Sequence, residues 1–282
     1  MKIGFCMLLW ASEVTRKHAA ILKDLKKTGY DGVEIPLFSG RPKDYAGLGN
    51  MLDDIGLERL SISVIPSTEK DPVSPDKASR QAAVDYLKWA IDCSAALGSK
   101  QLAGPLMQAL GHFTGKSPTD SEWKRARDVH RVVGEYARLH DVTIALEAVN
   151  RFEIYFANTM DDLVRYVRTV NHPNIKAMYD TFHSNIEEAD PVAAYARNAE
   201  DIVYVHISEN DRGVPGRGHV PWKETFRALK KKKYDGWLTI ESFGRGLPAL
   251  AAATRVWRDF AQGPEAVYRD GYQHIRKNWN AT

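Results

Sequence analysis

The stretch Ile144-Ala-Leu-Glu-Ala-Val-Asn-Arg-Phe-Glu153 decides how the rest of the chain is interpreted, because an apolar run leads straight into carboxylates. Residues 142–146 are typical of a strand that is buried on both faces, as in a parallel sheet. Glu147 stands where that strand should end. A carboxylate at the mouth of a buried strand, unlike one in a solvated loop, requires a structural or chemical reason.

The same pattern recurs three times further along the chain. Ile175-Lys-Ala-Met-Tyr179 leads into Asp180, Ile202-Val-Tyr-Val205 leads into His206, and Trp237-Leu-Thr-Ile240 leads into Glu241. Successive polar residues are separated by 33, 26 and 35 residues, about the length of one strand, one helix and two loops. Such repeats predict a parallel sheet in which two Glu, one Asp and one His converge at one end.

Eight strand-helix repeats can be counted along the 282 residues, which favours a single eightfold α/β barrel, the (β/α)8 TIM barrel. Strands are expected at 2–9, 32–35, 57–65, 100–104, 142–146, 175–179, 202–205 and 237–240. Helices are expected at 16–28, 42–55, 76–97, 119–140, 160–170, 191–198 and 221–233. We therefore expect one domain, 1–282, with a C-terminal helical extension at 247–260 and 264–279.

The composition is that of an ordinary globular protein, with 44% apolar residues, 27% charged residues and a formal net charge of +3. This balance predicts neither a nucleic-acid partner nor a membrane partner. No apolar run reaches the ~18 residues needed to span a bilayer, and the chain starts without a signal-peptide pattern. The chain has only two cysteines, Cys6 and Cys93, so a disulfide framework is not expected. We expect a cytoplasmic location.

Catalytic groups of such barrels gather at the carboxyl ends of the strands. Glu147, Asp180, His206 and Glu241 could each cap a helix or pair with an arginine instead. Four such groups at consecutive strand ends would repel one another unless a cation lay between them. Three carboxylates and one imidazole favour Mn²⁺ or Mg²⁺, with Co²⁺ possible, and leave coordination positions open for substrate oxygens.

Five motifs in one order carry a resemblance to a known family. They are Leu146-Glu-Ala-Val-Asn-Arg-Phe-Glu153, Asp180-Thr-Phe-His-Ser-Asn-Ile-Glu-Glu188, His206 with Glu209 and Arg212, Pro215-Gly-Arg-Gly-His-Val-Pro-Trp222, and Tyr234-Asp-Gly236 leading to Glu241. Together they resemble the ketose 3-epimerases, a group that includes the D-tagatose and D-psicose 3-epimerases, within the xylose isomerase-like barrel superfamily. The resemblance covers nearly the whole chain.

This resemblance implies a metal-dependent epimerase that inverts C3 of a free ketose of the D-tagatose, D-psicose/D-fructose or L-ribulose type. Glu147, Asp180, His206 and Glu241 would bind one Mn²⁺-like ion, and Glu147 and Glu241 would act as base and acid on opposite faces of the sugar. Proton removal beside a carbonyl gives a cis-enediolate, whose charge a divalent cation stabilises. No organic cofactor is expected. We expect the chain to form a homodimer or homotetramer.

The same resemblance implies that Glu153, His183 and Arg212 hold the oxygens of the sugar. His183 could instead be a packed polar residue on the loop after its strand, Glu153 could simply pair with Arg151, and Arg212 could lie on the surface.

The apolar wall over the sugar is expected from Trp10, Phe243 and the loop 106–113. The sequence departs from the family pattern at two places on that wall. The region 104–113 lacks the aromatic residue that usually covers the sugar, and Cys6 replaces a larger aromatic residue.

Several other functions remain open. Aldose-ketose isomerisation, as in relatives of hydroxypyruvate isomerase, and epimerisation of a 3-keto sugar derivative would need nearly the same metal site. An endonuclease for abasic DNA would need more histidines than His183 and His206 and a basic stripe for phosphates. A non-catalytic sugar-binding protein would not need two carboxylates that flank the metal.

Overall fold

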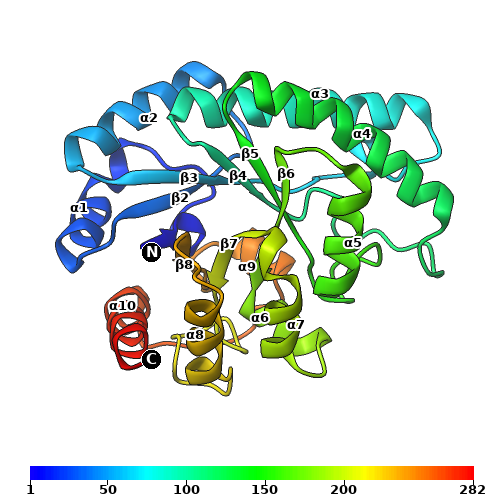
Figure 1. Cartoon of the computed structure of the whole chain (residues 1–282). Coiled ribbons are helices and arrows are strands. Elements are labelled where there is room, and N and C mark those ends of the chain that lie inside the picture. The colour runs from blue at the N-terminus through cyan, green and yellow to red at the C-terminus, as the bar shows by residue number, and fades with distance from the viewer.

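Eight parallel strands pair in sequence order, and the last pairs with the first, so the sheet closes into the predicted barrel (Figure 1). The computed structural model describes all 282 residues. The strands are β1 (Lys2–Cys6), β2 (Gly32–Pro36), β3 (Glu58–Ile62), β4 (Gln101–Gly104), β5 (Thr143–Glu147), β6 (Ile175–Asp180), β7 (Ile202–Ile207) and β8 (Trp237–Ile240).

An outer ring of helices covers the barrel. It consists of α1 (Ala19–Thr28), α2 (Pro42–Ile55), α3 (Lys77–Leu97), α4 (Asp120–Leu139), α5 (Met160–Val170), α7 (Pro191–Asn198), α8 (Trp222–Lys231) and α10 (Pro264–Ala281). The C-terminal helix α10 packs against both α8 and α1, so it fills the position between the last and first repeats (Figure 1). None of the helices is both long and apolar enough to cross a membrane.

The boundaries of the helices follow from their caps. Helix α3 begins after Asp76, whose side chain accepts a hydrogen bond of 2.8 Å from the backbone N–H of Ser79, and it ends at Gly98 in the left-handed conformation. Helix α4 begins with a reciprocal capping box between Thr119 and Glu122. These ends lie within one residue of those expected from the sequence.

The interior of the barrel explains why polar groups gather at one end. Leu60, Ala103, Ala145, Met178 and Tyr204 pack together inside the barrel. Side chains that are two residues apart on a strand point to the same face. The residues that follow this apolar layer by two positions on β5, β6 and β7 therefore also point inward, one step closer to the carboxyl ends. These residues, Glu147, Asp180 and His206, are three of the four candidate ligands predicted from the sequence.

Four segments differ from the expectation. The third strand ends at Ile62 rather than at residue 65. The first strand ends at Cys6 rather than at residue 9, because residues 7–9 turn into a short 3-10 helix. A short helix, α6 (Thr181–Glu187), follows β6 directly, because the side chain of Asp180 caps it. Between residues 247 and 260 only α9 (Pro248–Ala253) is helical, since Arg255 adopts a positive φ just beyond its end.

Candidate active site

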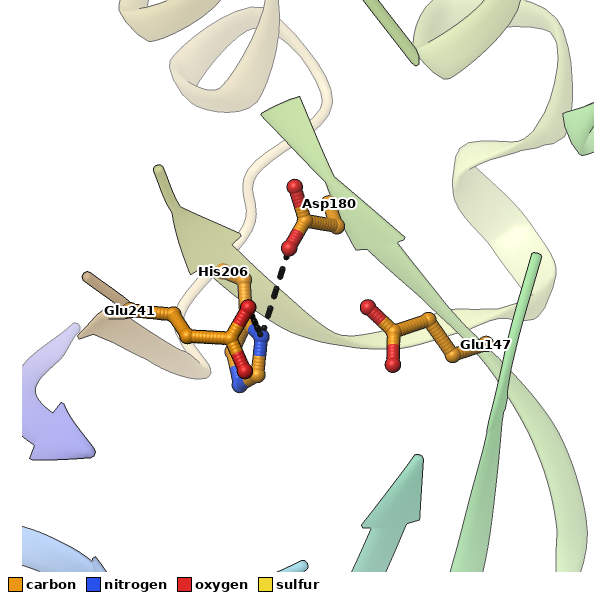
Figure 2. A group of neighbouring side chains, drawn as sticks. All are labelled: Glu147, Asp180, His206 and Glu241. Carbon is orange, nitrogen blue, oxygen red and sulfur yellow. Dashed lines mark ion pairs between the residues drawn. The ribbon is translucent and has the colours of Figure 1, made fainter. Parts of the chain in front are cut away.

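Four side chains from consecutive strands meet at the carboxyl end of the barrel. One potential ligand atom from each of Glu147, Asp180, His206 and Glu241 lies within 4.8 Å of the others, and all four residues are buried (Figure 2). Asp180 and His206 are direct partners in the register of β6 and β7. In Figure 2 Glu147 faces the other three groups from the opposite side of a shared space.

Burial and the neighbouring charges shift the pKa values of the carboxylates in this group. Burial, reinforced by Glu241 and Asp180, raises the pKa of Glu147 well above its usual range. Burial also acts to raise the pKa of Asp180, but the Arg212 guanidinium and the imidazole of His206 outweigh it and lower that pKa. Three carboxylates thus compete for few positive partners, which is the situation that a bound cation would relieve.

The donor atoms fit a divalent cation. Glu147 Oε1 and His206 Nδ1 are buried without a hydrogen-bond partner, and both face the group. His206 Nδ1 lies 3.5 Å from Asp180 Oδ2 and 3.6 Å from Glu241 Oε2. Three carboxylates and one imidazole match the oxygen-rich sites of Mn²⁺ or Mg²⁺ better than thiolate sites. The cluster is therefore a candidate metal site.

Glu34 on β2 supports this cluster, although no role was predicted for it from the sequence. It is fully buried, its carboxylate lies 3.2 Å from His206 Nε2, and it accepts a hydrogen bond of 2.7 Å from the hydroxyl of Tyr204. In a metal-bound, neutral imidazole, a carboxylate at this place favours the proton on Nε2, which would leave Nδ1 as the ligand atom. The sequence did contain a sign of this role, because Glu34 is a charged residue within the otherwise apolar strand 32–36.

Arg212 crosses the site from the loop after β7. Its guanidinium hydrogen-bonds Asp180 Oδ2 at 3.3 Å and Glu241 Oε2, and it stacks 3.8 Å from the ring centre of Phe182. The side chain is buried, and the backbone of Arg212 has a φ of +64°, an uncommon conformation for a residue with a side chain. A surface role for Arg212 does not agree with this position.

The loop that carries Arg212 is held by Glu209. The buried carboxylate of Glu209 accepts hydrogen bonds from the backbone N–H groups of Gly216 and Val220 and from Nε1 of Trp222, at 2.7, 3.1 and 2.8 Å. The backbone N–H of Asn210 also donates to it, at 3.1 Å, and a buried carboxylate with four donors holds the surrounding loop firmly. Glu209, which belongs to the quoted motif, therefore shapes the loop rather than the cavity.

His183 lies in α6 and not in a loop as expected. The backbone N–H of Asn150 donates to its Nδ1 at 3.0 Å, and its Nε2 lies 3.7 Å from Glu147 Oε1 and 2.9 Å from Arg212. Burial, together with the positive charge of Arg212, lowers the pKa of His183 to about 3. The ring is therefore neutral in the physiological range and offers a hydrogen bond rather than a charge.

Glu153 does not form the ion pair with Arg151 that the sequence left open. Arg151 pairs instead with Glu187 of α6 at 2.8 Å. The carboxylate of Glu153 accepts a hydrogen bond of 2.8 Å from Asn150 and lines the same cavity as Glu147. Burial raises the pKa of Glu153 above its ordinary value.

A cavity of about 470 Å³ opens above the cluster. Its ionisable lining residues are Glu147, Glu153, His183, Arg212 and Glu241. The remainder is mostly apolar and includes Leu8, Phe38, Ile62, Val64, Leu110, Phe243, Leu247 and Leu250.

The apolar wall expected from the sequence is only partly present. Phe243 lines the cavity, as does Leu110 of the loop 106–113. Trp10 instead packs on Phe5 and Tyr268, with ring centres 4.9 and 5.9 Å away, and Phe113 is exposed on the surface. The side chains from β3 and from α9 that line the cavity were not expected, because sequence periodicity does not show which loop folds back over a barrel.

The alternative of a DNA-cleaving enzyme finds no support in the geometry. Of the nine histidines of the chain, only His183 and His206 lie at the site. The other group of potential ligands, Cys6 with Glu34 and Glu241, adjoins the first and contains no histidine.

Comparison with known proteins agrees with this geometry. The family described as "Xylose isomerase-like TIM barrel" matches residues 22–278. A ketose 3-epimerase from Arthrobacter globiformis is 31% identical over 284 residues, covering 100% of this chain and 98% of that protein. An L-ribulose 3-epimerase from Mesorhizobium japonicum is 32% identical, covering 92% and 87%. The crystal structure of a D-allulose 3-epimerase from Methylomonas sp. in complex with D-allulose superposes with a TM-score of 0.91 at 28% identity, covering 99% and 97%.

Proposed function

Because the chain belongs to the ketose 3-epimerase family within the xylose isomerase-like TIM barrel superfamily, we propose that it inverts C3 of a free ketose of the D-tagatose, D-psicose/D-fructose or L-ribulose type. One observation supports this most directly. Glu147 and Glu241 face each other across a buried space, with Asp180 and His206 beside them (Figure 2). Inversion without redox chemistry needs two such groups on opposite faces of one carbon.

In the proposed mechanism one of the two glutamates removes the proton from C3, and the other returns a proton from the opposite face. Burial of Glu147 favours its accepting and holding a proton, because burial disfavours the ionised carboxylate. Glu147, Asp180, His206 and Glu241 would hold one Mn²⁺, with Mg²⁺ or Co²⁺ as substitutes. The chemistry that this ion supplies is electrostatic stabilisation of the negative charge of the cis-enediolate.

Three further residues are proposed to hold the sugar. Arg212 and the neutral His183 would donate hydrogen bonds to the oxygens near C2 and C3, and Glu153 would accept one from a hydroxyl. All three line the cavity beside Glu147. Their positions are held by the partners described above, so that the sugar meets a preorganised surface.

The rival is aldose-ketose isomerisation at a similar site. Incubation of the Mn²⁺-loaded enzyme with a panel of free ketoses in D₂O separates the two reactions. Deuterium at C3 of a product with inverted C3 is the expected result. Deuterium at C1 together with an aldose product would refute the epimerase.

We also propose that the chain assembles as a homodimer or homotetramer. Phe113, Phe152 and Ile186 are exposed, and Phe152 retains 72% of its accessible surface. They lie on neighbouring segments, because the N–H of Gly111 donates to the carbonyl of Glu153 and Arg151 pairs with Glu187. Light scattering on a Phe152→Ser variant would test this, with dissociation as the expected result.

A further inference from the structure

A second group of potential metal ligands adjoins the candidate metal site. It consists of Cys6, Glu34 and Glu241, and one ligand atom from each lies within 4.8 Å of the others. All three residues are buried, and Cys6 and Glu34 are completely enclosed. The group shares Glu241 with the candidate metal site but takes its other two members from β1 and β2. The proposed reaction assigns no role to the Cys6 thiol.

The register of three neighbouring strands brings these groups together. Cys6 on β1 and Glu34 on β2 are direct register partners, so their side chains point to the same face of the sheet. On the other side of β1, Phe5 pairs with Ile240 of β8, and Glu241 is the next residue. The three ligand groups therefore stand at one level of the barrel wall, positioned by strands and not by loops.

Glu34 is a buried carboxylate without a cation. Its Oε1 accepts a hydrogen bond from the hydroxyl of Tyr204, whereas its Oε2 is buried without a hydrogen-bond partner. The one arginine nearby, Arg212, pairs with Asp180 and Glu241 instead. Enclosing a carboxylate is costly unless a positive charge lies beside it. The free oxygen of Glu34 therefore points to a cation on its own side of the barrel.

The charges around the two groups support a second ion. The carboxylates of Glu34, Glu147, Asp180 and Glu241 are all buried. One divalent ion at the candidate metal site and Arg212 would supply three positive charges for these four carboxylates. A second divalent ion, bound with Cys6 as a thiolate, would give five positive charges for five negative ones. Two ions that share a carboxylate lie roughly 3.5–4 Å apart in known two-metal sites.

The donor set indicates which kind of ion would bind. A thiolate with two carboxylates suits Zn²⁺ or Co²⁺ better than Mn²⁺ or Mg²⁺, which prefer oxygen ligands alone. Ligand atoms around one such ion lie roughly 3–4 Å apart, so atoms already within 4.8 Å of one another need only small side-chain rotations. Binding would release the proton of the Cys6 thiol to solvent, because the thiolate is the form that binds metals.

We propose that Cys6, Glu34 and Glu241 form a second metal site, for a thiophilic divalent cation such as Zn²⁺ or Co²⁺, beside the candidate metal site with which it shares Glu241. Glu241 lines the cavity, which gives the ion a route from solvent. The inference goes beyond the proposed function, because it concerns metal binding and no step of the reaction.

The test uses Co²⁺ as the probe, because a thiolate bound to Co²⁺ gives a charge-transfer absorption in the near ultraviolet that carboxylate and imidazole ligands do not give. The reduced, metal-free protein is titrated with Co²⁺, and the bound ions are counted by equilibrium dialysis. We expect two equivalents to bind, one of which produces the thiolate absorption.

The two cysteines of the chain provide a matched pair of variants. Cys6→Ser should lose the thiolate absorption and one of the two equivalents, with an unchanged circular dichroism spectrum. Cys93→Ser is the control, because Cys93 is also a buried free cysteine but belongs to neither ligand group. It should keep both equivalents and the absorption. Since Cys6 is then the only thiol, this control assigns the absorption to Cys6 even if Cys6→Ser does not fold.

Three results would overturn the inference. They are absence of the absorption in the unaltered protein, an absorption that persists in Cys6→Ser or disappears in Cys93→Ser, and a single bound equivalent that carries the absorption. In the last case the ion would lie at Cys6 in place of the candidate metal site. Turnover enters none of these results. Absence of C3 exchange in the Mn²⁺-loaded enzyme would refute the proposed function and leave the second site standing.

Discussion

The contact between Glu34 and His206 makes a sharp prediction about metal binding. In Glu34→Gln the side chain keeps its size, but the charge beside His206 Nε2, now 3.2 Å away, is lost. The amide can also present its NH₂ group to Nε2, which would move the ring proton to Nδ1 and block the ligand atom. Loss of such a supporting carboxylate weakens metal binding by about 10- to 100-fold. This corresponds to about 1.4–2.7 kcal/mol.

The assay is calorimetric titration of the metal-free protein with Mn²⁺, in parallel with thermal unfolding. Glu34→Gln should bind Mn²⁺ more weakly, whereas its Tm without metal should not fall, because the variant removes a buried charge. Glu58→Gln, at an exposed ion pair with Lys2 near the other end of the barrel, is the control and should bind Mn²⁺ normally. If Glu34→Gln binds Mn²⁺ within twofold of the unaltered protein, the role assigned to Glu34 is wrong.

Three further predictions concern the proposed acid-base pair, the bridging arginine and a buried histidine. Glu147→Gln and Glu241→Gln should each lower kcat by at least about a hundredfold in a folded protein, measured by C3 exchange and circular dichroism; full activity in either would contradict the acid and base assignment. Arg212→Ala should raise KM for the sugar more than it raises the Kd for Mn²⁺. Arg217→Ala, at an exposed ion pair, is the control and should change neither. Complete loss of Mn²⁺ binding in Arg212→Ala would instead show that the main role of Arg212 is to hold Asp180 and Glu241. Burial lowers the pKa of His130 to about 4, so the unfolded chain binds a proton that the folded chain does not, and stability should rise by about 3 kcal/mol between about pH 4 and pH 6.5. Denaturant unfolding of His130→Gln should show that rise reduced relative to the exposed His219→Gln control, and an unchanged rise would place its origin elsewhere.

The parts of the fold that were predicted correctly are those with a local physical signal. The carboxylates and the imidazole at 147, 180, 206 and 241 each end an apolar run, and parallel pairing brings strand ends together. The ends of the helices expected at 76–97 and 119–140 were also predicted to within one residue, because residues that cap helices, Asp76, Gly98 and Thr119, stand there.

The features that were missed depend on contacts between distant segments. Glu34 looked like part of a plain strand, because its partners His206 and Tyr204 lie about 170 residues away. The position of Trp10 depends on Tyr268 in the last helix. The contribution of α9 to the cavity likewise depends on how the segment after β8 folds back, which no periodicity shows.

Asp180 divides its two oxygens between two tasks. Oδ1 accepts the backbone N–H groups of Phe182 and His183 at the start of α6, while Oδ2 faces His206 and Arg212. The short helix that carries His183 is thus anchored by an atom of the candidate metal cluster. Metal binding and the orientation of the His183 side chain therefore depend on the same residue. A substitution of Asp180 that removes both carboxylate oxygens would disturb both. Asp180→Asn would keep an oxygen that accepts hydrogen bonds from the first turn of α6, but it would remove the negative charge from the metal cluster. This substitution therefore separates the two roles.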